Sequence, residues 1–339
     1  MEDINKIKLI HGIKNSFSVD DNTMNKFIEQ IESSDLRGNI ERFFRGYTVE
    51  DAFHILFSAM PWVKLIHELG QSQLPTLSKE TYQVPDFTIF FETGKKEQKP
   101  ILLEVKSVKG DSQSLEVMTR QMYACIAYSK IVGIPFLYAI YWQKYQTWTF
   151  NAVENFHARS KKYRIKFLDA FKNDLSVVVG DITFVISQPI YRKTVCDHSI
   201  TDAEKSQHKK FGTIFSDSVS MDNQNFIVIQ SFESAIIDSS IKMKIIDTKK
   251  DGDKTTITEM SDSNYFLKLS TATLRHLAIF GVELNEQYAD LSRRMIIEFF
   301  KKLNITRSYA IPNSKTPTSD TLYNQAFEES WVLANYSTT

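Results

Sequence analysis

The chain has 339 residues, 42% hydrophobic and 24% charged, which is the composition of an ordinary globular protein and excludes intrinsic disorder. Lysine plus arginine and aspartate plus glutamate balance at 41 each, so attraction of nucleic acid by the chain as a whole is excluded, although a local basic face is not. The two cysteines, Cys125 and Cys196, exclude a disulfide framework. Without a secretory run at the N-terminus or an apolar stretch of about 20 residues, we expect a cytoplasmic protein with no membrane partner.

The N-terminal half is predicted to consist of helices followed by a sheet. Thr48 is placed to cap a helix that would end near Pro61. The other expected elements are a helix over 22–33, strands over 62–69, 82–91, 101–105 and 135–142, and a helix over 114–131. The order helix, three strands, helix, strand predicts an α/β layer with a mixed sheet.

The second half of the sequence has a different pattern. Residues 152–173 are predicted to form a basic helix, after which short β-rich runs alternate with polar loops. These runs are 176–186, 226–230, 241–246 and 255–259, and a helix over 285–303 follows them. We place a boundary near residue 175, which predicts a domain over 1–174 and a β-rich α+β region over 175–339 for binding DNA or a partner.

Two carboxylates interrupt the apolar strands. Asp86 follows Pro85, and Glu104 lies in the apolar run that ends in Val105 and Lys106. A buried carboxylate is costly unless a partner compensates for it, and a hard divalent cation with oxygen ligands does so. Glu104 and Lys106 share a strand face because they are two residues apart. If the two strands form a hairpin, Asp86 comes beside Glu104.

Two carboxylates and one ammonium suit phosphodiester hydrolysis. A cation held by Asp86 and Glu104 would neutralise the phosphate and lower the pKa of a bound water, and Lys106 would orient that water or stabilise developing charge. The alternatives are a turn residue after proline for Asp86, and a solvated strand face with a cross-strand ion pair for Glu104 and Lys106. Leu102, which shares that face, is an argument against a solvated face.

The spacing of these residues, Pro85-Asp86 followed 18 positions later (104 − 86) by Glu104-Val105-Lys106, resembles that of the PD-(D/E)XK, or restriction-endonuclease-like, nuclease superfamily. The resemblance covers about residues 40 to 150. It implies an αβββαβ core with a mixed sheet, a Mg²⁺ or Mn²⁺ cofactor, and products that carry a 5′-phosphate. It further implies catalytic roles for Asp86, Glu104 and Lys106, and a metal site at Asp86, Glu104 and Val105.

Two further positions fit the resemblance. Glu50 would be an additional metal-binding acid, with Glu41 and Asp51 as rivals for that role and a favourable first-turn acid as the alternative. Gln121, on the helix after Lys106, would face the site and belong to its catalytic residues. A QxxxY pattern is lacking, because Cys125 stands where tyrosine would be.

We therefore expect a divalent-metal-dependent DNA endonuclease in restriction, phage defence or mobile-element biology. Four residues of the predicted basic helix would contact DNA phosphates, with a solvated helix face as the alternative: Arg159, Lys161, Lys162 and Arg164. The partners expected by analogy are a second copy of the chain or a larger defence or transposition complex. Without a Gly-rich GKS/T loop, use of an NTP by this chain is not expected. The alternatives are a subunit that is active only in such a complex, and an inactive nucleic-acid-binding scaffold.

Overall fold

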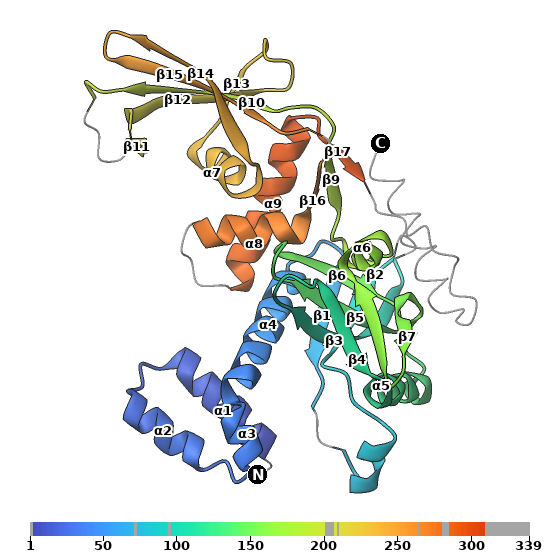
Figure 1. Ribbon diagram of the computed structural model, residues 1–339. Helices are drawn as coiled ribbons and strands as arrows, with labels where there is room; N and C mark the ends of the chain where they lie inside the picture. Colours follow the sequence, from blue (N-terminus) through green and yellow to red (C-terminus); the bar gives the residue numbers. More distant parts are fainter. Residues whose placement is uncertain are drawn as a thin grey trace.

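Four helices open the fold. The computed structural model describes residues 3–70, 73–93, 96–200, 207–208, 210–263, 265–279 and 285–308. The first helices are α1 (Asp3–Ser16), α2 (Asp21–Glu29), α3 (Ser34–Gly38) and α4 (Ile40–Ser58). Together with the first half of α4, helices α1 to α3 enclose a small apolar core of their own, and α4 then leads from this helical unit to the main sheet (Figure 1).

The predicted start of α4 near Thr48 is wrong, because the helix begins at Ile40. Apolar side chains of its first turns, including Ile40 and Phe44, pack against α1 to α3 and extend the helix toward the N-terminus. The Thr48 hydroxyl donates a hydrogen bond of 3.0 Å to the carbonyl of Phe44, one turn earlier in the same helix. It is therefore an interior helix residue and not a cap.

The main sheet follows α4 and has the strand order β1-β2-β3-β5-β6. Its strands are β1 (Val63–Glu68), β2 (Phe87–Glu92), β3 (Gln98–Val108), β5 (Phe136–Trp142) and β6 (Thr147–Asn151). All neighbours pair antiparallel except β3 and β5, which are parallel and are joined through α5 (Thr119–Val132). The fold is thus mixed α/β with a mixed sheet, as predicted, and the antiparallel pairing of β2 with β3 brings Asp86 level with Glu104.

A small sheet beside α5 corrects two predictions. Its strands, in the order β4-β8-β7, are β4 (Ser114–Met118), β7 (His157–Arg159) and β8 (Lys162–Lys166). The predicted helix over 114–131 is therefore wrong for its first five residues and correct from Thr119 onward. The predicted helix over 152–173 is wrong, because this segment forms a short 3₁₀ turn, the β7–β8 hairpin and only one short helix, α6 (Phe167–Lys172).

The C-terminal region, as far as the structure describes it, is rich in β-strands and also contains three α-helices. Its larger sheet has the order β11-β12-β10-β15-β14, with β13 paired to β12. The strands are β10 (Tyr191–Asp197), β11 (Gln207–His208), β12 (Gly212–Ser220), β13 (Ile227–Val228), β14 (Met243–Asp251) and β15 (Lys254–Ser261). A three-stranded sheet comprises β16 (Tyr265–Lys268), β9 (Thr183–Ile186) and β17 (Thr306–Ser308). The helices are α7 (Ser231–Ser240), α8 (Leu269–Ile279) and α9 (Glu286–Lys302).

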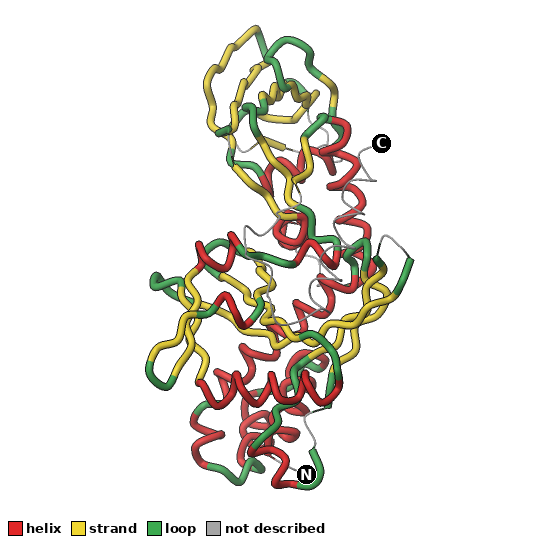
Figure 2. The backbone as a smooth tube through the Cα atoms, turned by 90° about the vertical axis from the view of Figure 1, so that its right-hand side faces the viewer, coloured by secondary structure: helices red, strands yellow, loops and turns green. Residues whose placement is uncertain are grey.

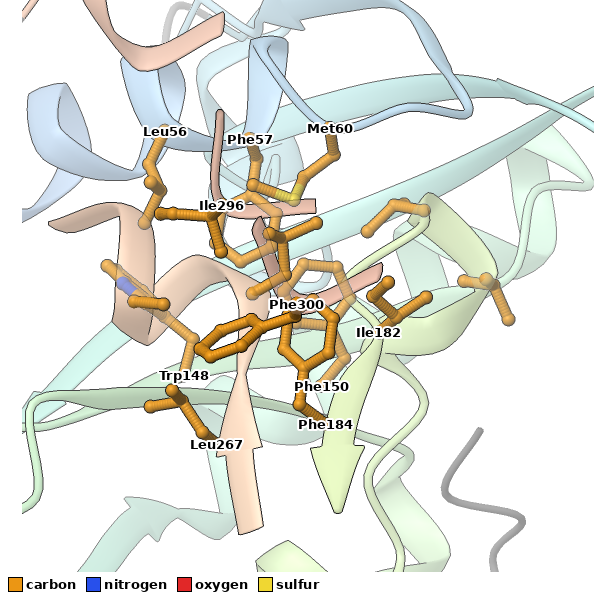
Figure 3. Close-up of a cluster of buried hydrophobic side chains, with 14 of the residues drawn as sticks. Leu56, Phe57, Met60, Trp148, Phe150, Ile182, Phe184, Leu267, Ile296 and Phe300 are labelled. Carbon is orange, nitrogen blue, oxygen red and sulfur yellow. The ribbon is translucent and has the colours of Figure 1, made fainter. Parts of the chain in front are cut away.

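Both halves of the chain contribute to the main hydrophobic core. Figure 3 shows side chains of α4 and β6 packed against side chains of β9, β16 and α9. The residues labelled there are Leu56, Phe57, Met60, Trp148, Phe150, Ile182, Phe184, Leu267, Ile296 and Phe300. The view in Figure 2 shows the helices of this junction between the main sheet and the C-terminal strands. The two sides of residue 175 therefore share one apolar interior.

A buried ion cluster lies at the same junction. The ammonium of Lys268 on β16 lies 2.5 Å from the Asp174 carboxylate and 2.9 Å from that of Asp181. Backbone and side-chain donors of Ser176 and Ser270 satisfy these carboxylates further. Buried charges are tolerated only when they are paired in this way.

Among the described residues, no helix is both long and apolar enough to cross a membrane.

Candidate active site

Strand pairing brings Asp86 and Glu104 together. Asp86 directly precedes β2, and the register that pairs Phe87 with Leu103 places it opposite Glu104. One oxygen of Asp86, Oδ2, accepts a hydrogen bond of 2.7 Å from the backbone N–H of Val105.

The carboxylate of Glu104 is the centre of the arrangement. It is 2% exposed, and its Oε1 accepts hydrogen bonds from Lys106 at 2.6 Å, Gln121 at 3.2 Å and Gln83 at 3.2 Å. Its other oxygen, Oε2, is buried and has no hydrogen-bond partner among the residues that the structure describes. A buried carboxylate oxygen without a hydrogen-bond partner is costly, so this position suits a cation as its partner.

Lys106 lies between two oxygens of the same strand. Besides the Glu104 carboxylate, its ammonium donates to the carbonyl of Val105 at 3.1 Å, and its side chain is 29% exposed. Burial acts to lower the pKa of Lys106, but the carboxylates of Glu104, Asp86 and Glu50 outweigh it and raise the pKa above its ordinary value. Lys106 is therefore an ammonium over the whole neutral range.

The acids of the site disfavour one another's charge. Burial raises the pKa of Asp86 well above its ordinary value, and the charge of Glu104 adds to that rise, while Lys106 opposes it. Burial likewise raises the pKa of Glu50, against the attraction of Lys106. A cation bound among these carboxylates would stabilise the charged form of each of them. The raised pKa values of Asp86 and Glu50 therefore favour cation binding at this position.

A cleft of about 430 Å³ opens beside these residues, between α4 and β3. Its lining residues are Gly46, Val49, Glu50, Val105, Lys106, Ser107 and Lys109. Glu50 lies in the middle of α4 and reaches the cleft, whereas its rivals point elsewhere: Glu41 faces Lys14, and Asp51 faces His11. Of the three acids considered for the additional position, the structure brings only Glu50 to the site.

The four basic residues predicted to contact DNA lie on the β7–β8 hairpin and its turn, and not on a helix. Arg159 and Lys161 are exposed. Lys162 pairs with Glu116 at 2.8 Å, and Arg164 donates to Ser114. The carbonyl of Lys161 accepts a hydrogen bond from the backbone of Thr119, so the hairpin is attached to the start of α5, two residues before Gln121.

The residues present fit a divalent cation in part. Among the described residues there is no group of three or more histidine, cysteine, aspartate or glutamate side chains arranged to hold a metal ion. The donors available are two carboxylates, Asp86 and Glu104, with the unpartnered Oε2 atom and the carbonyl of Val105. Such all-oxygen sets with few protein ligands are typical of Mg²⁺, which keeps several waters and binds substrate phosphates.

One site residue was not predicted from the sequence. Gln83 contacts Glu104 from the extended segment before β2, three positions ahead of Asp86. A glutamine in a β-rich run carries no signal of its own, because its role depends on how the segment crosses α5. The backbone N–H of Gln83 donates to the carbonyl of Ala124 in α5, which sets that crossing.

No known protein family matches the sequence, and no curated protein is found to be similar to it. Among solved structures, the chain is similar to Hjc, a Holliday junction resolvase from the archaeal hyperthermophile Archaeoglobus fulgidus, with a TM-score of 0.31 and 15% sequence identity. The similarity covers 40% of this chain and 96% of that chain. A TM-score of this size indicates a loose likeness only.

Proposed function

We propose that this chain is a divalent-metal-dependent nuclease of the PD-(D/E)XK type that cuts DNA internally. The observation that carries the proposal is the convergence of Asp86, Glu104 and Lys106 at the junction of β2 and β3, with a buried Glu104 oxygen left without a partner. The order α4, β1, β2, β3, α5, β5, with β4 inserted, supports the αβββαβ core that the resemblance implies.

The proposed chemistry is hydrolysis of a phosphodiester bond. A bound Mg²⁺ or Mn²⁺ supplies charge neutralisation at the phosphate and a water of lowered pKa. Asp86, Glu104 and the Val105 carbonyl would hold the cation, with Glu50 as the additional acid across the cleft. The Lys106 ammonium, which stays protonated, would stabilise the negative charge that develops on the phosphate oxygens.

We propose that basic residues of the cleft and of the β7–β8 hairpin bind the substrate. Lys109 lines the cleft beside Lys106, and Arg159 and Lys161 lie exposed on the hairpin attached to α5. Lysine and arginine are the usual contacts to phosphate, and they position the backbone without reading the sequence of bases. Restriction, phage defence or mobile-element biology is the setting that we propose.

A second candidate is a nuclease subunit that is active only within a larger complex or as a homodimer. The equal numbers of acidic and basic residues, 41 each, favour it over a chain that binds DNA tightly alone. In this case the C-terminal region over 175–339 would dock onto the partner. An inactive scaffold is the less favoured alternative, because the acids and the lysine are all in place.

The first test is cleavage of DNA by the purified chain. Supercoiled plasmid, linear duplex and closed circular single strands are incubated with Mg²⁺, Mn²⁺ or EDTA, and with Asp86→Ala, Glu104→Ala and Lys106→Ala beside the wild type. The matched control is Asp111→Ala, which removes a carboxylate that is 98% exposed and lies just after β3. We expect metal-dependent cutting of the circular substrates by the wild type and the control only.

Two results would redirect the proposal. Cutting that survives all three alanine substitutions would place the activity outside this site. If the wild type cuts no substrate with any metal, the partner-dependent subunit or the inactive scaffold becomes the favoured function. Cutting that appears when a second protein component is added would then identify the subunit.

A further inference from the structure

The two oxygens of the Glu104 carboxylate have unequal surroundings. Oε1 receives three N–H groups, from Lys106, Gln83 and Gln121, and Oε2, although buried, receives none from the described part of the chain. A carboxylate oxygen has two lone pairs, so three donors saturate Oε1. Rotation of the group would break all three hydrogen bonds at once. The carboxylate is therefore held in one orientation, with Oε2 as its free side.

The two amides come from opposite directions. Gln121 lies in the first turn of α5, while Gln83 lies in the extended segment between the 3₁₀ turn over Thr76–Glu80 and β2. The main chain of Gln83 is itself fixed, because its N–H donates to the carbonyl of Ala124 at 3.1 Å. Gln83 thus links α5 to β3 through one backbone and one side-chain hydrogen bond.

Neutral donors orient a carboxylate without neutralising it. An ammonium such as that of Lys106 orients Glu104 but also offsets its negative charge, which weakens the attraction for a second cation. The amides of Gln83 and Gln121 carry no net charge, so they orient Glu104 without opposing the approach of a cation. Hydrogen-bond partners of this kind, behind a metal ligand, typically contribute about 10- to 100-fold to metal affinity.

We propose that Gln83 is a positioning residue that fixes the Glu104 carboxylate so that Oε2 is presented to a divalent cation. The inference rests on the proposed function, since it assigns to Glu104 the role of metal ligand. It adds a residue outside the Asp86, Glu104 and Lys106 set, and it assigns a direction to the carboxylate: Oε1 faces the protein donors and Oε2 faces the cation.

The experiment measures Mn²⁺ binding to the full chain by the electron paramagnetic resonance signal of free Mn²⁺, and the Mn²⁺ dependence of DNA cleavage. The variants are Gln83→Met, which keeps the volume and removes the donor, and Gln83→Ser, which is too short to reach Glu104. The matched control is Gln98→Met, on the exposed start of β3. Thermal unfolding in EDTA identifies any variant that does not fold, and the other variant then takes its place.

We expect both Gln83 variants to bind Mn²⁺ about 10-fold more weakly than the wild type, with the Mn²⁺ concentration for half-maximal cleavage raised by the same factor. The cleavage rate at saturating Mn²⁺ should stay within about threefold of the wild type, and Gln98→Met should match the wild type in every respect. Unchanged Mn²⁺ binding overturns the inference. An unchanged binding constant with a reduced saturating rate also overturns it, and identifies Gln83 as a substrate contact.

Failure of the proposed function has a different signature. If the wild type and Glu104→Ala bind Mn²⁺ equally, or neither binds it, the metal site itself is absent and the nuclease proposal fails with it. If Glu104→Ala loses Mn²⁺ while Gln83→Met retains wild-type affinity, the metal site stands and only the role of Gln83 is refuted.

Discussion

At the residue scale, the ammonium of Lys106 lies close to the atoms that are proposed to hold a cation. It contacts Glu104 Oε1 at 2.6 Å and the Val105 carbonyl at 3.1 Å. Lys106 therefore has two opposed effects: its charge suits the negative phosphate of the reaction, and the same charge repels the divalent cation. The first effect belongs to catalysis and the second to binding, so the two are separable by experiment.

Replacing Lys106 by methionine should separate them. We expect Lys106→Met to bind Mn²⁺ more tightly, by about tenfold or 1.4 kcal/mol, because a competing positive charge is removed from the carboxylate. Cleavage should fall by at least about 100-fold, the usual loss when a charge-stabilising donor is deleted. Titration of Mn²⁺ and single-turnover cleavage measure the two effects. Weaker Mn²⁺ binding in Lys106→Met would show that the lysine organises the site and does not compete with the cation.

The raised pKa of Asp86 makes stability depend on pH. Since the folded pKa lies above the unfolded one, this group's contribution is complete below the ordinary aspartate pKa and is lost as the pH rises through the raised value. In EDTA at pH 7 we expect Asp86→Asn to unfold at a higher temperature than the wild type, with the gap closing toward about pH 4. Asp111→Asn serves as the exposed control. If the difference in unfolding temperature between Asp86→Asn and the wild type widens on acidification, the pKa of Asp86 is not raised.

At the scale of elements, the β7–β8 hairpin shows why part of the fold escaped prediction. Its turn, at Ser160 and Lys161, contains neither glycine nor asparagine, although Ser160 adopts a positive φ of 49°. The usual hairpin signal is therefore missing. Leu115, Met118 and Met122 lie at helical spacing, which predicted a helix, but Leu115 and Val117 are the buried pair and alternate as in a strand. The second error arises from tertiary packing that overrides a local pattern.

The hairpin carries a prediction about DNA binding. We expect Arg159→Ala combined with Lys161→Ala to weaken binding of duplex DNA and to reduce the slope of log affinity against log salt by about 1 to 2, since each lost phosphate contact removes about 0.9. Fluorescence anisotropy between about 50 and 200 mM KCl, in the Glu104→Ala background, measures it. The control is Lys244→Ala with Lys249→Ala on β14, which should leave the slope unchanged. Equal losses in both pairs would mean that no specific face is used.

At the scale of the whole molecule, the sequence was most informative where charged residues interrupted an apolar strand. Asp86 and Glu104 were singled out because acids in apolar strands require compensation, and the pairing of β2 with β3 confirms that the two residues lie side by side. The C-terminal arrangement was not accessible in this way. Its sheet pairs strands distant in sequence, such as β10 with β15, and the pairing of Lys268 with Asp174 spans 94 residues. No local pattern encodes such contacts.

The cluster around Lys268 predicts how the two halves of the chain depend on each other. We expect Lys268→Met to reduce the free energy of unfolding by about 3–5 kcal/mol, because it leaves Asp174 and Asp181 buried without a cation. Lys244→Met, which breaks an exposed pair with Asp262, should cost at most about 1 kcal/mol. Urea denaturation measures both. A small effect of Lys268→Met would show that water reaches the carboxylates.

Helix α4 passes through two separate apolar interiors, and the transition lies at the cleft. Its first half packs with α1 to α3 through residues such as Phe44, and its second half enters the main core through Phe53 and Phe57, while Gly46 and Glu50 between them face the cleft. Backbone amides exchange with solvent at rates set by the unit that must open to expose them. Hydrogen exchange should therefore slow abruptly along this single helix, between a faster N-terminal half and a protected C-terminal half. The cleft would then lie between two units that open independently of each other. A ligand bound there contacts both units and makes them open together.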